Sequence, residues 1–377
     1  MTVKKRKLIL EDGSVYLGEA FGAETDKMVE LVFNTSMVGY QEILSDPSYT
    51  GQAVVMTYPL IGNYGMCEDD YETLIPSMSG LIVREYCDEP SNFRSANTLS
   101  QIMKTYDIAG ISKIDTRKLA RHIRDFGSCK AYLVSEDSDT DKALERLKAW
   151  KPDPDVVSKV STGKIYKAGM LVDNTNKQKY KHIVAIDCGM KKNILRELSK
   201  RGCSITVVPW DTSAEEIKEL CPDGLFISNG PGDPQDVKQT IETVKNMIGY
   251  CPIFGICLGH QIISLAYGAK TYKLKFGHRG GNHPVKNLYK DRIEITSQNH
   301  SYAVDDESLK GTGLEATHIN LLDNTVEGVA CKKDRVFSVQ YHPESAPGPQ
   351  DSSYLFDEFL KMIDDKNVNS KEVVKNA

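Results

Sequence analysis

The second half of the chain alternates between short apolar runs and longer amphipathic segments, and this alternation constrains the fold more than any other feature. Short runs rich in Ile and Val are typical of buried strands, and apolar residues at helical spacing are typical of the segments between them. The predicted strands lie at 182–186, 204–208, 224–227 and 252–256, and the predicted helices at 192–201, 213–220, 236–248 and 259–267. Further strands are expected at 292–296 and 335–340. The pattern predicts an α/β fold with a mostly parallel sheet flanked by helices.

The first half has a different pattern, in which short apolar runs are separated by Gly, Pro and Asn. These runs lie at 8–10, 29–33 and 81–83. One helix stands out: Asp115 or Thr116 is a suitable N-cap, and apolar residues follow at helical spacing up to Gly127, where a glycine commonly ends a helix. A second helix is expected at 141–150. The first half is therefore predicted to be a β-rich α+β domain.

A chain of 377 residues exceeds the length at which single cores usually stop growing, so two domains are expected. The segment 151–180 begins with Lys-Pro-Asp-Pro-Asp and continues with polar residues and little apolar periodicity, as interdomain connections do. One short strand, at 170–172, fits within it. The predicted division is an N-terminal domain at 1–150, a linker at 151–180 and a C-terminal domain at 181–377.

Charge and composition exclude several classes of protein. A formal net charge of -5 gives no basic field for nucleic acid or an anionic membrane surface. The apolar run Leu8–Leu10 is too short for a signal peptide, and no stretch has the roughly 18 apolar residues of a spanning helix. The nine cysteines are scattered, with no C-x-x-C pair. We expect a cytoplasmic protein with reduced thiols, one of which could be reactive.

Two groups of charged or ligating residues have ordinary interpretations. Four histidines alternate with Gly, Asn and Arg in predicted loops without carboxylates at ligand spacing, so no metal site is predicted: His260, His278, His283 and His300. Lys191 and Lys192 near the first strand-to-helix turn are interpreted as a solvated helix start or an interface contact.

Cys257 lies in the sequence Gly255-Ile-Cys-Leu-Gly259, between a predicted strand and a predicted helix. This is the context of a nucleophile elbow with cysteine in place of serine, in which flanking glycines allow a sharp turn. The helix N-terminus favours thiolate over thiol. The alternative is that Cys257 is a small buried apolar residue, as most cysteines are.

His342 and Glu344 follow the last predicted strand in the sequence His-Pro-Glu, at another edge of the sheet. A nucleophilic thiol needs a base within hydrogen-bond reach and a third group that orients the base. Cys257, His342 and Glu344 supply these three groups. Taken alone, His-Pro-Glu is equally a surface turn, because proline is common in loops.

A third element is the glycine-rich turn that contains Gly230 and Gly232, at the end of the strand 224–227. Glycines let backbone N–H groups approach a substrate closely, as an oxyanion hole requires. A plain tight turn and a phosphate-binding loop are the alternatives. The phosphate loop fails because no Lys-Ser or Lys-Thr pair follows the glycines.

Together these elements resemble the class I (triad) glutamine amidotransferases. Additional motifs make the chain similar to the small subunits of carbamoyl-phosphate synthetases, over residues of about 8 to 364. The motifs that carry the resemblance are 228–234, 255–261 and 340–344 for the wider class, and 33–49, 114–119, 275–284 and 298–300 for the small subunits.

The resemblance implies a role for each motif position. Cys257 would attack the side-chain amide of L-glutamine, and His342, oriented by Glu344, would transfer protons. Backbone N–H groups of Gly230 and Leu258 would bind the oxyanion. The remaining glutamine-binding residues would be Gly232, Gln261, Asn299, Ser301 and Tyr302, with Ser48 from the N-terminal domain. Ser301 and Tyr302 stand where Gly and Phe are familiar in the family, so backbone contacts are expected there.

The resemblance also implies a partner, a large subunit that makes carbamoyl phosphate from bicarbonate, ammonia and ATP in a heterodimer or higher heteromer. ATP and Mg²⁺ are expected on that subunit and no cofactor in this chain, which has no Walker A sequence and no G-x-G-x-x-G. We expect the N-terminal domain to dock the partner. Another cysteine hydrolase and a non-catalytic scaffold are the competing functions, and the choice between arginine and pyrimidine synthesis stays open.

Overall fold

The computed structural model describes residues 4–168 and 180–375. By its internal contacts the chain divides into two compact units, 1–156 with 274–280 and 157–273 with 281–377. This division differs from the predicted one in two places. The second unit begins inside the predicted linker, and the first unit includes a short segment from the second half of the chain.

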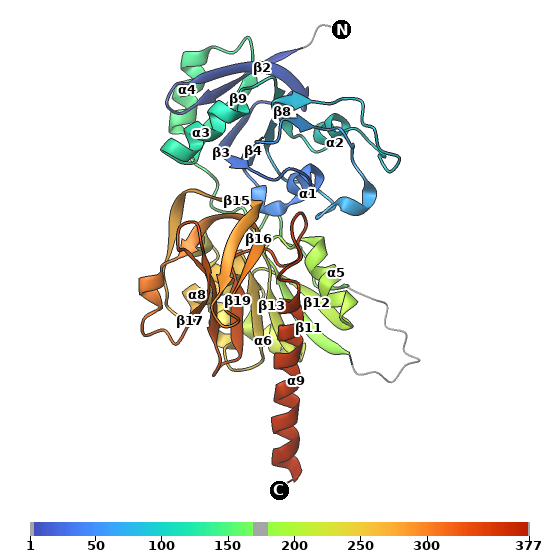
Figure 1. The fold of residues 1–377 in the computed structure, drawn as a ribbon, viewed down its shortest axis with the longest axis vertical. Helices are drawn as coiled ribbons and strands as arrows, with labels where there is room; N and C mark the ends of the chain where they lie inside the picture. Colours follow the sequence, from blue (N-terminus) through green and yellow to red (C-terminus); the bar gives the residue numbers. More distant parts are fainter. Residues whose placement is uncertain (1–3, 169–179, 376–377) are drawn as a thin grey trace. The chain divides into compact units, whose positions relative to one another are not determined.

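The first unit is built around a closed barrel (Figure 1). Its strands are, in barrel order, β1 (Lys5–Leu10), β2 (Val15–Gly22), β8 (Ala109–Ser112), β6 (Gly80–Ile82), β4 (Gln52–Met56), β3 (Lys27–Asn34) and β9 (Cys129–Ser135). Strand β9 pairs with β1 and closes the ring. Successive residues point to opposite faces of a strand, and both faces are buried here: Leu31 and Val32 pack in two different apolar clusters. The β-rich prediction is confirmed.

Four helices accompany the barrel: α1 (Tyr40–Ser45), α2 (Leu99–Thr105), α3 (Thr116–Phe126) and α4 (Thr140–Ala149). Strands β5 (Leu60–Ile61) and β7 (Glu85–Tyr86) form a separate pair, and η1 (Pro47–Tyr49) and η2 (Glu68–Asp70) are 3₁₀ turns. Helix α3 begins and ends where the sequence predicts. The Asp115 carboxylate accepts the Lys118 N–H at 3.0 Å, and Gly127 has the left-handed φ of 103° at the other end.

The second unit contains one ten-stranded sheet. Its order is β10 (Tyr166–Ala168), β12 (Cys203–Pro209), β11 (Lys181–Asp187), β13 (Gly224–Ile227), β14 (Ile253–Ile256), β19 (Val336–Val339), β18 (Val326–Cys331), β16 (Arg292–Val304), β15 (Thr271–Asn287) and β17 (Glu315–Asn320). The run from β12 to β19 is parallel, whereas β18 pairs antiparallel with β19. The α/β prediction is confirmed, and the antiparallel pairings involve β10 at one edge and the strands β15 to β18 at the other end of the sheet.

Helices cover both faces of this sheet, because the residues of its central strands alternate between two apolar clusters. Val184 packs with α6 (Ala214–Glu219), α7 (Lys238–Met247) and α8 (Leu258–Ala266). Its neighbour Ala185 faces the opposite cluster, which includes residues of α5 (Lys192–Lys200) and α9 (Tyr354–Lys375). The remaining 3₁₀ turns are η3 (Pro234–Asp236) and η4 (Asp306–Leu309). Because strands β12, β11, β13, β14 and β19 run parallel, their carboxyl ends lie at the same edge of the sheet.

Part of the predicted linker belongs to the second unit. Val157 is buried in its core, the Thr162 N–H donates to Asp187 Oδ2 at 2.8 Å, and β10 pairs antiparallel with β12. The chain is polar there because β10 is an edge strand, for which sequence periodicity is weak. The strand predicted at 170–172 lies outside the described residues.

The segment 274–280 of β15 belongs to the first unit. Its carbonyl oxygens accept backbone N–H groups of that unit, from Ser128 to Lys275 at 2.9 Å and from Thr35 to Arg279 at 3.3 Å. Such a pairing joins residues far apart in the chain, and a local pattern cannot predict it.

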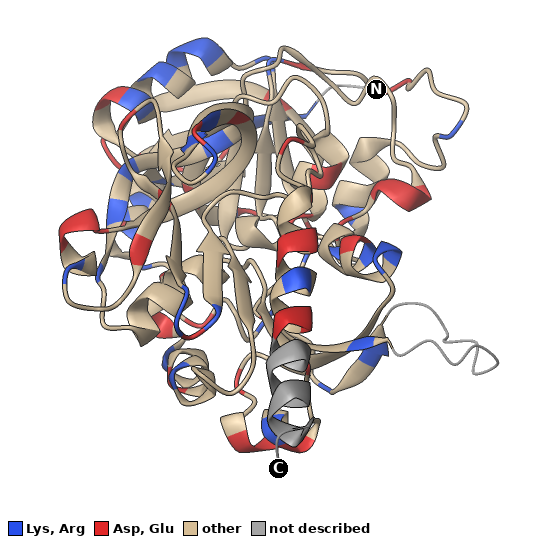
Figure 2. Cartoon of the chain, turned by 60° about the horizontal axis from the view of Figure 1, so that its bottom comes forward, with Lys and Arg blue, Asp and Glu red and all other residues tan. Residues whose placement is uncertain are grey.

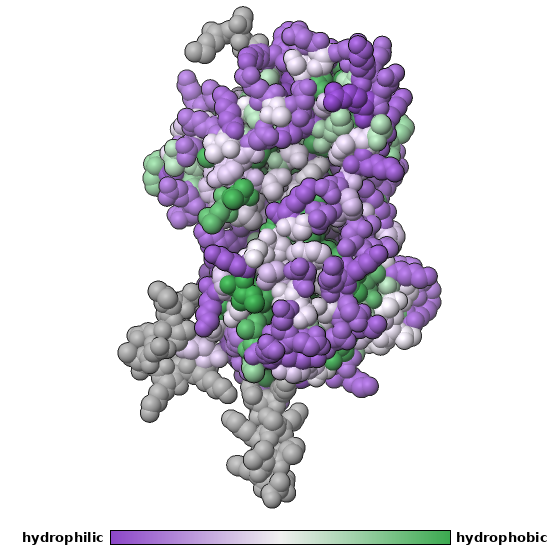
Figure 3. Space-filling view, turned by 180° about the vertical axis from the view of Figure 1, so that it is seen from behind, coloured by the Kyte–Doolittle hydropathy of each residue, from purple (hydrophilic) through white to green (hydrophobic). Residues whose placement is uncertain are grey.

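The surface carries both signs of charge (Figure 2). On α9, Asp357, Lys361 and Asp364 are exposed, whereas Phe356 and Phe359 are buried. On the face seen in Figure 3, hydrophilic residues predominate and hydrophobic side chains form small separate patches. Among the described residues, no helix has the length and apolar character needed to cross a membrane.

Candidate active site

Cys257 lies between the end of β14 and the start of α8, with φ 54° and ψ −104°. Left-handed backbone in a residue with a side chain costs about 1–3 kcal/mol, and such strain is found at functional sites. The flanking glycines have a different purpose from the predicted one, because neither has a left-handed φ. A Cβ on Gly259 would lie 2.3 Å from the Ile227 carbonyl oxygen, and one on Gly255 would lie 2.6 Å from Ile263 Cδ1. The glycines provide space, and Cys257 itself makes the turn.

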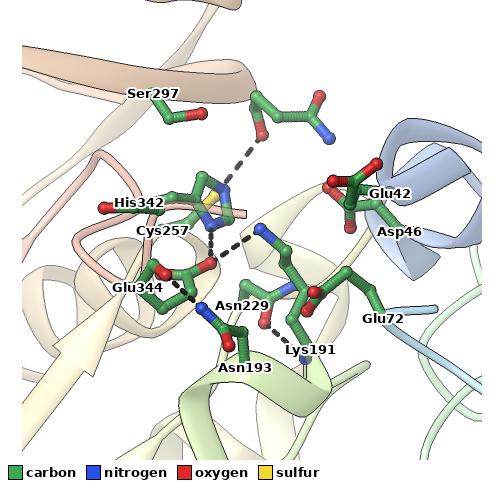
Figure 4. Close-up of polar contacts among 12 residues, drawn as sticks. Glu42, Asp46, Glu72, Lys191, Asn193, Asn229, Cys257, Ser297, His342 and Glu344 are labelled. Carbon is green, nitrogen blue, oxygen red and sulfur yellow. Dashed lines mark hydrogen bonds and ion pairs between the residues drawn. The ribbon is translucent and has the colours of Figure 1, made fainter. Parts of the chain in front are cut away.

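His342 and Glu344 form the hydrogen-bonded pair that the sequence predicts. Nδ1 of His342 lies 2.7 Å from Glu344 Oε1, and both residues are only 2 % exposed. Nε2 of His342 makes no hydrogen bond to any described residue, yet Cys257 is close enough to raise the pKa of His342. Figure 4 shows the imidazole beside Cys257. The unpaired Nε2 is therefore available to the thiol.

The charges of this pair are set by neighbours. Burial lowers the pKa of His342, but the Glu344 carboxylate outweighs burial and raises this pKa to about 10. Burial raises the pKa of Glu344, but Lys191 and His342 outweigh it and lower this pKa to about 2. At neutral pH His342 is therefore an imidazolium and Glu344 a carboxylate.

Lys191 was not predicted to belong to this site. Its Nζ lies 2.8 Å from Glu344 Oε1, and its side chain is only 2 % exposed, so the interpretation of a solvated helix start is wrong for Lys191, whereas Lys192 is exposed. Asn229 and Asn193 were also missed: Asn229 Oδ1 accepts the Lys191 N–H at 3.1 Å, and Asn193 donates its amide to the Glu344 carbonyl (Figure 4). One signal was present in the sequence. Lysine is an unfavourable residue at a helix N-terminus.

The glycine-rich turn lies against Cys188 and α8. A Cβ on Gly230 would lie 2.1 Å from the Cys188 carbonyl oxygen and 2.8 Å from Leu258 Cδ2. Gly230 is thus next to Leu258, the first residue of α8, and the first N–H groups of a helix have no intrahelical partner. The binding of an oxyanion by the N–H groups of Gly230 and Leu258 stays a prediction. Gly232 lies two residues further on, exposed and with φ 91°.

Besides the glycine-rich turn, the predicted glutamine-binding residues of the second unit come from α8 and β16. Cys257 Sγ lies 3.5 Å from the Asn299 carbonyl oxygen, and Gln261 Nε2 donates to the Tyr302 carbonyl oxygen at 2.8 Å. Gln261 Nε2 also contacts Gln340 Oε1 at 2.9 Å. Ser301, between Asn299 and Tyr302, is half-buried. The structure therefore brings α8 and β16 together beside the cysteine.

Ser48 is the one predicted site residue of the first unit. It lies in η1, is buried, and its N–H donates to Asp46 Oδ1 at 2.9 Å. Its contact with glutamine stays a prediction.

The raised pKa of His342 predicts how stability depends on pH. Because this pKa is about 10 in the folded chain and 6.5 ordinarily, the His342 contribution is full below 6.5 and is lost as the pH rises through 10. We expect the difference in unfolding free energy between the wild type and His342→Gln to narrow between about pH 6 and pH 10, as measured by urea unfolding. In a Glu344→Gln background, which lacks the carboxylate, the narrowing should be smaller. A difference that is constant with pH would contradict this prediction.

Comparison with known proteins agrees with the fold and the site. The profile of the family "Glutamine amidotransferase class-I" matches residues 184–362. The second unit, with a cysteine at an elbow and a buried histidine–glutamate pair, is thus a class-I glutamine amidotransferase domain. The profile "Carbamoyl-phosphate synthase small chain, CPSase domain" matches residues 8–133. The chain belongs to the carbamoyl-phosphate synthase small-chain family.

Relatives that match over nearly their full length are named as small chains of carbamoyl phosphate synthase. The carbamoyl phosphate synthase small chain of Fusobacterium nucleatum is 55% identical over 359 residues, which cover 95% of this chain and 98% of the relative. That of Bacillus cereus is 52% identical over 373 residues, 99% of this chain and 100% of the relative. The "Carbamoyl phosphate synthase pyrimidine-specific small chain" of Bacillus subtilis is 50% identical over 373 residues, with the same coverage.

Proposed function

We propose that this chain is the glutaminase subunit of a glutamine-hydrolysing carbamoyl-phosphate synthetase, which releases ammonia from L-glutamine for a large subunit. The observation that carries this proposal is the arrangement of Cys257, His342 and Glu344 at the carboxyl ends of the parallel strands. Cys257 has the strained backbone of an elbow, and His342 has its Nδ1 on Glu344 and its Nε2 unpaired among the described residues. A buried base with this geometry serves a nucleophile.

In the proposed mechanism, the Cys257 thiolate attacks the side-chain amide carbon of glutamine. The oxyanion of the tetrahedral intermediate accepts hydrogen bonds from the N–H groups of Gly230 and Leu258. The His342 imidazolium gives its proton to the amide nitrogen, the C–N bond breaks, and ammonia leaves a γ-glutamyl thioester. His342 then takes a proton from water, which attacks the thioester and releases glutamate and the thiol.

Glutamine is held by the α8 and β16 residues around Cys257. We assign the binding of its carboxylate and amine to Gln261, Asn299, Ser301 and Tyr302, with Gly232 and Ser48. The contacts of Gln261 with Tyr302 and Gln340 support a role in holding β16 beside the ligand. Ser301 and Tyr302 contribute backbone groups, consistent with the use of the Tyr302 carbonyl in this network.

The partner we propose is the ATP-using large subunit, since the relatives described above are named as small chains. Ammonia set free in bulk water is largely protonated and is then no nucleophile, so direct delivery within a heterodimer or higher heteromer makes chemical sense. This chain needs no cofactor or metal for the steps above, and ATP and Mg²⁺ belong to the large subunit. We place the reaction in the cytoplasm, where the nine free cysteines stay reduced.

The decisive experiment measures carbamoyl phosphate synthesis with glutamine or with ammonia, with and without the cognate large subunit. We expect both nitrogen sources to work in the complex. A complex that makes carbamoyl phosphate from ammonia but never from glutamine would contradict the proposal and favour a non-catalytic scaffold. Turnover of γ-glutamyl peptides with no turnover of free glutamine would favour another cysteine hydrolase.

We further propose that the first unit docks the large subunit. This unit has an apolar hollow of about 90 Å³. It is lined by Met37, Val38, Tyr40, Met56, Tyr58, Leu60, Ile61, Asn63 and Tyr64. Met37 and Val38 are each 70% exposed, which is unusual for apolar side chains side by side.

The docking proposal predicts that the double substitution Met37→Glu and Leu60→Glu weakens the complex by roughly tenfold or more, because charge then faces an apolar partner surface. Surface plasmon resonance with the large subunit measures the effect, and thermal unfolding checks the fold. The matched control is Ile293→Glu in the second unit, where Ile293 is 60% exposed. Equal affinities for the double variant and the wild type would contradict the prediction.

A further inference from the structure

Gln340 follows strand β19 directly and is fully buried. Its backbone N–H donates to the Glu327 carbonyl oxygen at 2.9 Å, which fixes the end of β19 against β18. Its side-chain Oε1 accepts a hydrogen bond from Gln261 Nε2 at 2.9 Å, whereas its own Nε2 makes no hydrogen bond to any described residue. The polar contact of this side chain is therefore with a predicted glutamine-binding residue.

A buried amide with an unpaired end is an unfavourable choice for packing alone. An N–H group that is removed from water without a partner destabilises the fold. Methionine has a similar length and no donor that needs a partner, so it would fill the space at position 340 without this cost. Residues that break such a rule are commonly retained for function. What glutamine adds at position 340 is the oxygen that faces Gln261.

Gln261 lies on α8 one turn after Cys257, and its backbone N–H donates to the Cys257 carbonyl oxygen at 3.2 Å. Residues four positions apart share one face of a helix. Both hydrogens of the Gln261 amide nitrogen are used, for the Tyr302 carbonyl oxygen at 2.8 Å and for Gln340 Oε1 at 2.9 Å. Because both partners are acceptors, the nitrogen end of this amide faces them and the oxygen end faces away.

The oxygen of the Gln261 amide is left for a ligand. Gln261 Oε1 makes no hydrogen bond to any residue that the structure describes. An amide oxygen only accepts hydrogen bonds, an ammonium group only donates them, and a carboxylate only accepts them. The exposed end of this amide therefore suits the ammonium group of an α-amino acid and repels its carboxylate. With the amide turned around, the preference would be reversed.

We propose that Gln340 is a specificity-determining positioning residue, which holds the Gln261 amide with its oxygen towards the ligand and so selects the ammonium group of glutamine. This inference rests on the function proposed above and deepens it. Gln340 acts through Gln261, since its own oxygen is taken up by that residue. Without Gln340, only the Tyr302 carbonyl holds the amide, and one N–H of Gln261 loses its partner.

The test is the substitution Gln340→Met in the full chain, assayed as the complex with the large subunit. We expect KM for L-glutamine to rise about tenfold, because the loss of a buried hydrogen-bond partner has effects of this size. The kcat should stay within about threefold, since the lost interaction stabilises bound substrate and transition state alike.

Ser338→Ala is the matched control. Ser338 lies two residues earlier, in β19, is also fully buried, and its Oγ lies 2.9 Å from His260 Nδ1. The control removes a buried hydrogen bond between β19 and α8 without touching the Gln261 amide. Its KM for L-glutamine should stay within about threefold of the wild type.

Two readouts separate positioning from a general structural defect. The first is competitive inhibition by glutaric acid monoamide, which has the carboxylate and the amide of glutamine but lacks the amine. Its inhibition constant should change by less than about twofold in Gln340→Met, because a group that recognises the amine cannot discriminate a ligand without one. The second is a double-mutant cycle, in which Gln340→Met should add little to KM in a Gln261→Met background.

A second variant and a fold check keep the test informative. Gln340→Asn keeps an amide but withdraws its oxygen from Gln261 by one methylene group, so KM for L-glutamine should rise here as well. Thermal unfolding and ammonia-dependent carbamoyl phosphate synthesis by the complex report whether each variant is folded and assembled.

Several outcomes would overturn the inference. These are an unchanged KM in both Gln340 variants, an equal rise of KM in Ser338→Ala, an inhibition constant of the monoamide that rises as much as KM, and an equal effect in the Gln261→Met background. None of them bears on the proposed function, which fails only if the wild-type chain and its partner do not use glutamine.

Discussion

Cys257→Ser is expected to abolish glutamine-dependent carbamoyl phosphate synthesis, with kcat at least roughly a thousandfold lower, while ammonia-dependent synthesis by the complex persists. Loss of a triad nucleophile alone typically costs about as much as loss of the whole triad. The imidazolium of His342 can stabilise a thiolate, but a serine hydroxyl stays protonated and is a far poorer nucleophile here. Because oxygen is smaller than sulfur and Cys257 is 2 % exposed, the fold should tolerate the change.

The measurement compares glutamine and ammonia as nitrogen sources for the complex of wild type or variant with the large subunit. Cys221→Ser is the control, because Cys221 is an exposed thiol in the same unit. If Cys257→Ser retained glutamine-dependent synthesis, the nucleophile would be another group. If it lost the ammonia-dependent reaction as well, the substitution would have damaged the complex and not only the glutaminase.

Gly230→Ala is expected to lower kcat for glutamine hydrolysis by about a hundredfold to a thousandfold, the usual effect of losing one oxyanion donor. The added Cβ would lie 2.1 Å from the Cys188 carbonyl oxygen, a backbone atom that cannot rotate away. The neighbouring Cys188 N–H is held by Ser228 Oγ at 2.9 Å, so the strand end resists movement. The turn that carries the Gly230 N–H has to shift instead.

Steady-state kinetics of glutamine hydrolysis tests this prediction. Loss of the oxyanion donor should lower kcat and leave KM unchanged. Gly163→Ala is the matched control, because a Cβ at Gly163 would meet no atom within 4 Å and its φ is not left-handed. A Gly230→Ala variant with kcat within about threefold of the wild type would show that the turn is not an oxyanion donor.

Much of the fold was predictable because its signals are local. Asp115 and Gly127 predict the ends of the helix at 116–126, and the structure has its caps at these residues. The central strands of the second unit are continuous apolar runs, as strands buried on both faces must be. Strand β10 and the segment 274–280 were missed, because an edge strand and a long-range pairing carry little local signal.

The predicted triad residues lie close together because each follows a strand of the parallel sheet, and the ends of such strands converge. Even so, the reason for the flanking glycines was misjudged. The turn strain lies on Cys257, whereas Gly255 and Gly259 are required by the close approach of Ile263 and the Ile227 carbonyl oxygen. A steric requirement of this kind depends on atoms brought in by other segments.

The sequence by itself therefore determined the α/β alternation, the elbow at Cys257 and the candidate base His342, because strand, turn and helix signals act over a few residues. Only the tertiary structure decided that Lys191 is buried on Glu344 and that Gly230 lies against Cys188. Both contacts join loops that follow different strands, Lys191 and Glu344 being 153 positions apart. The charge state and rigidity of the site depend on the packing of these loops, which no single segment encodes.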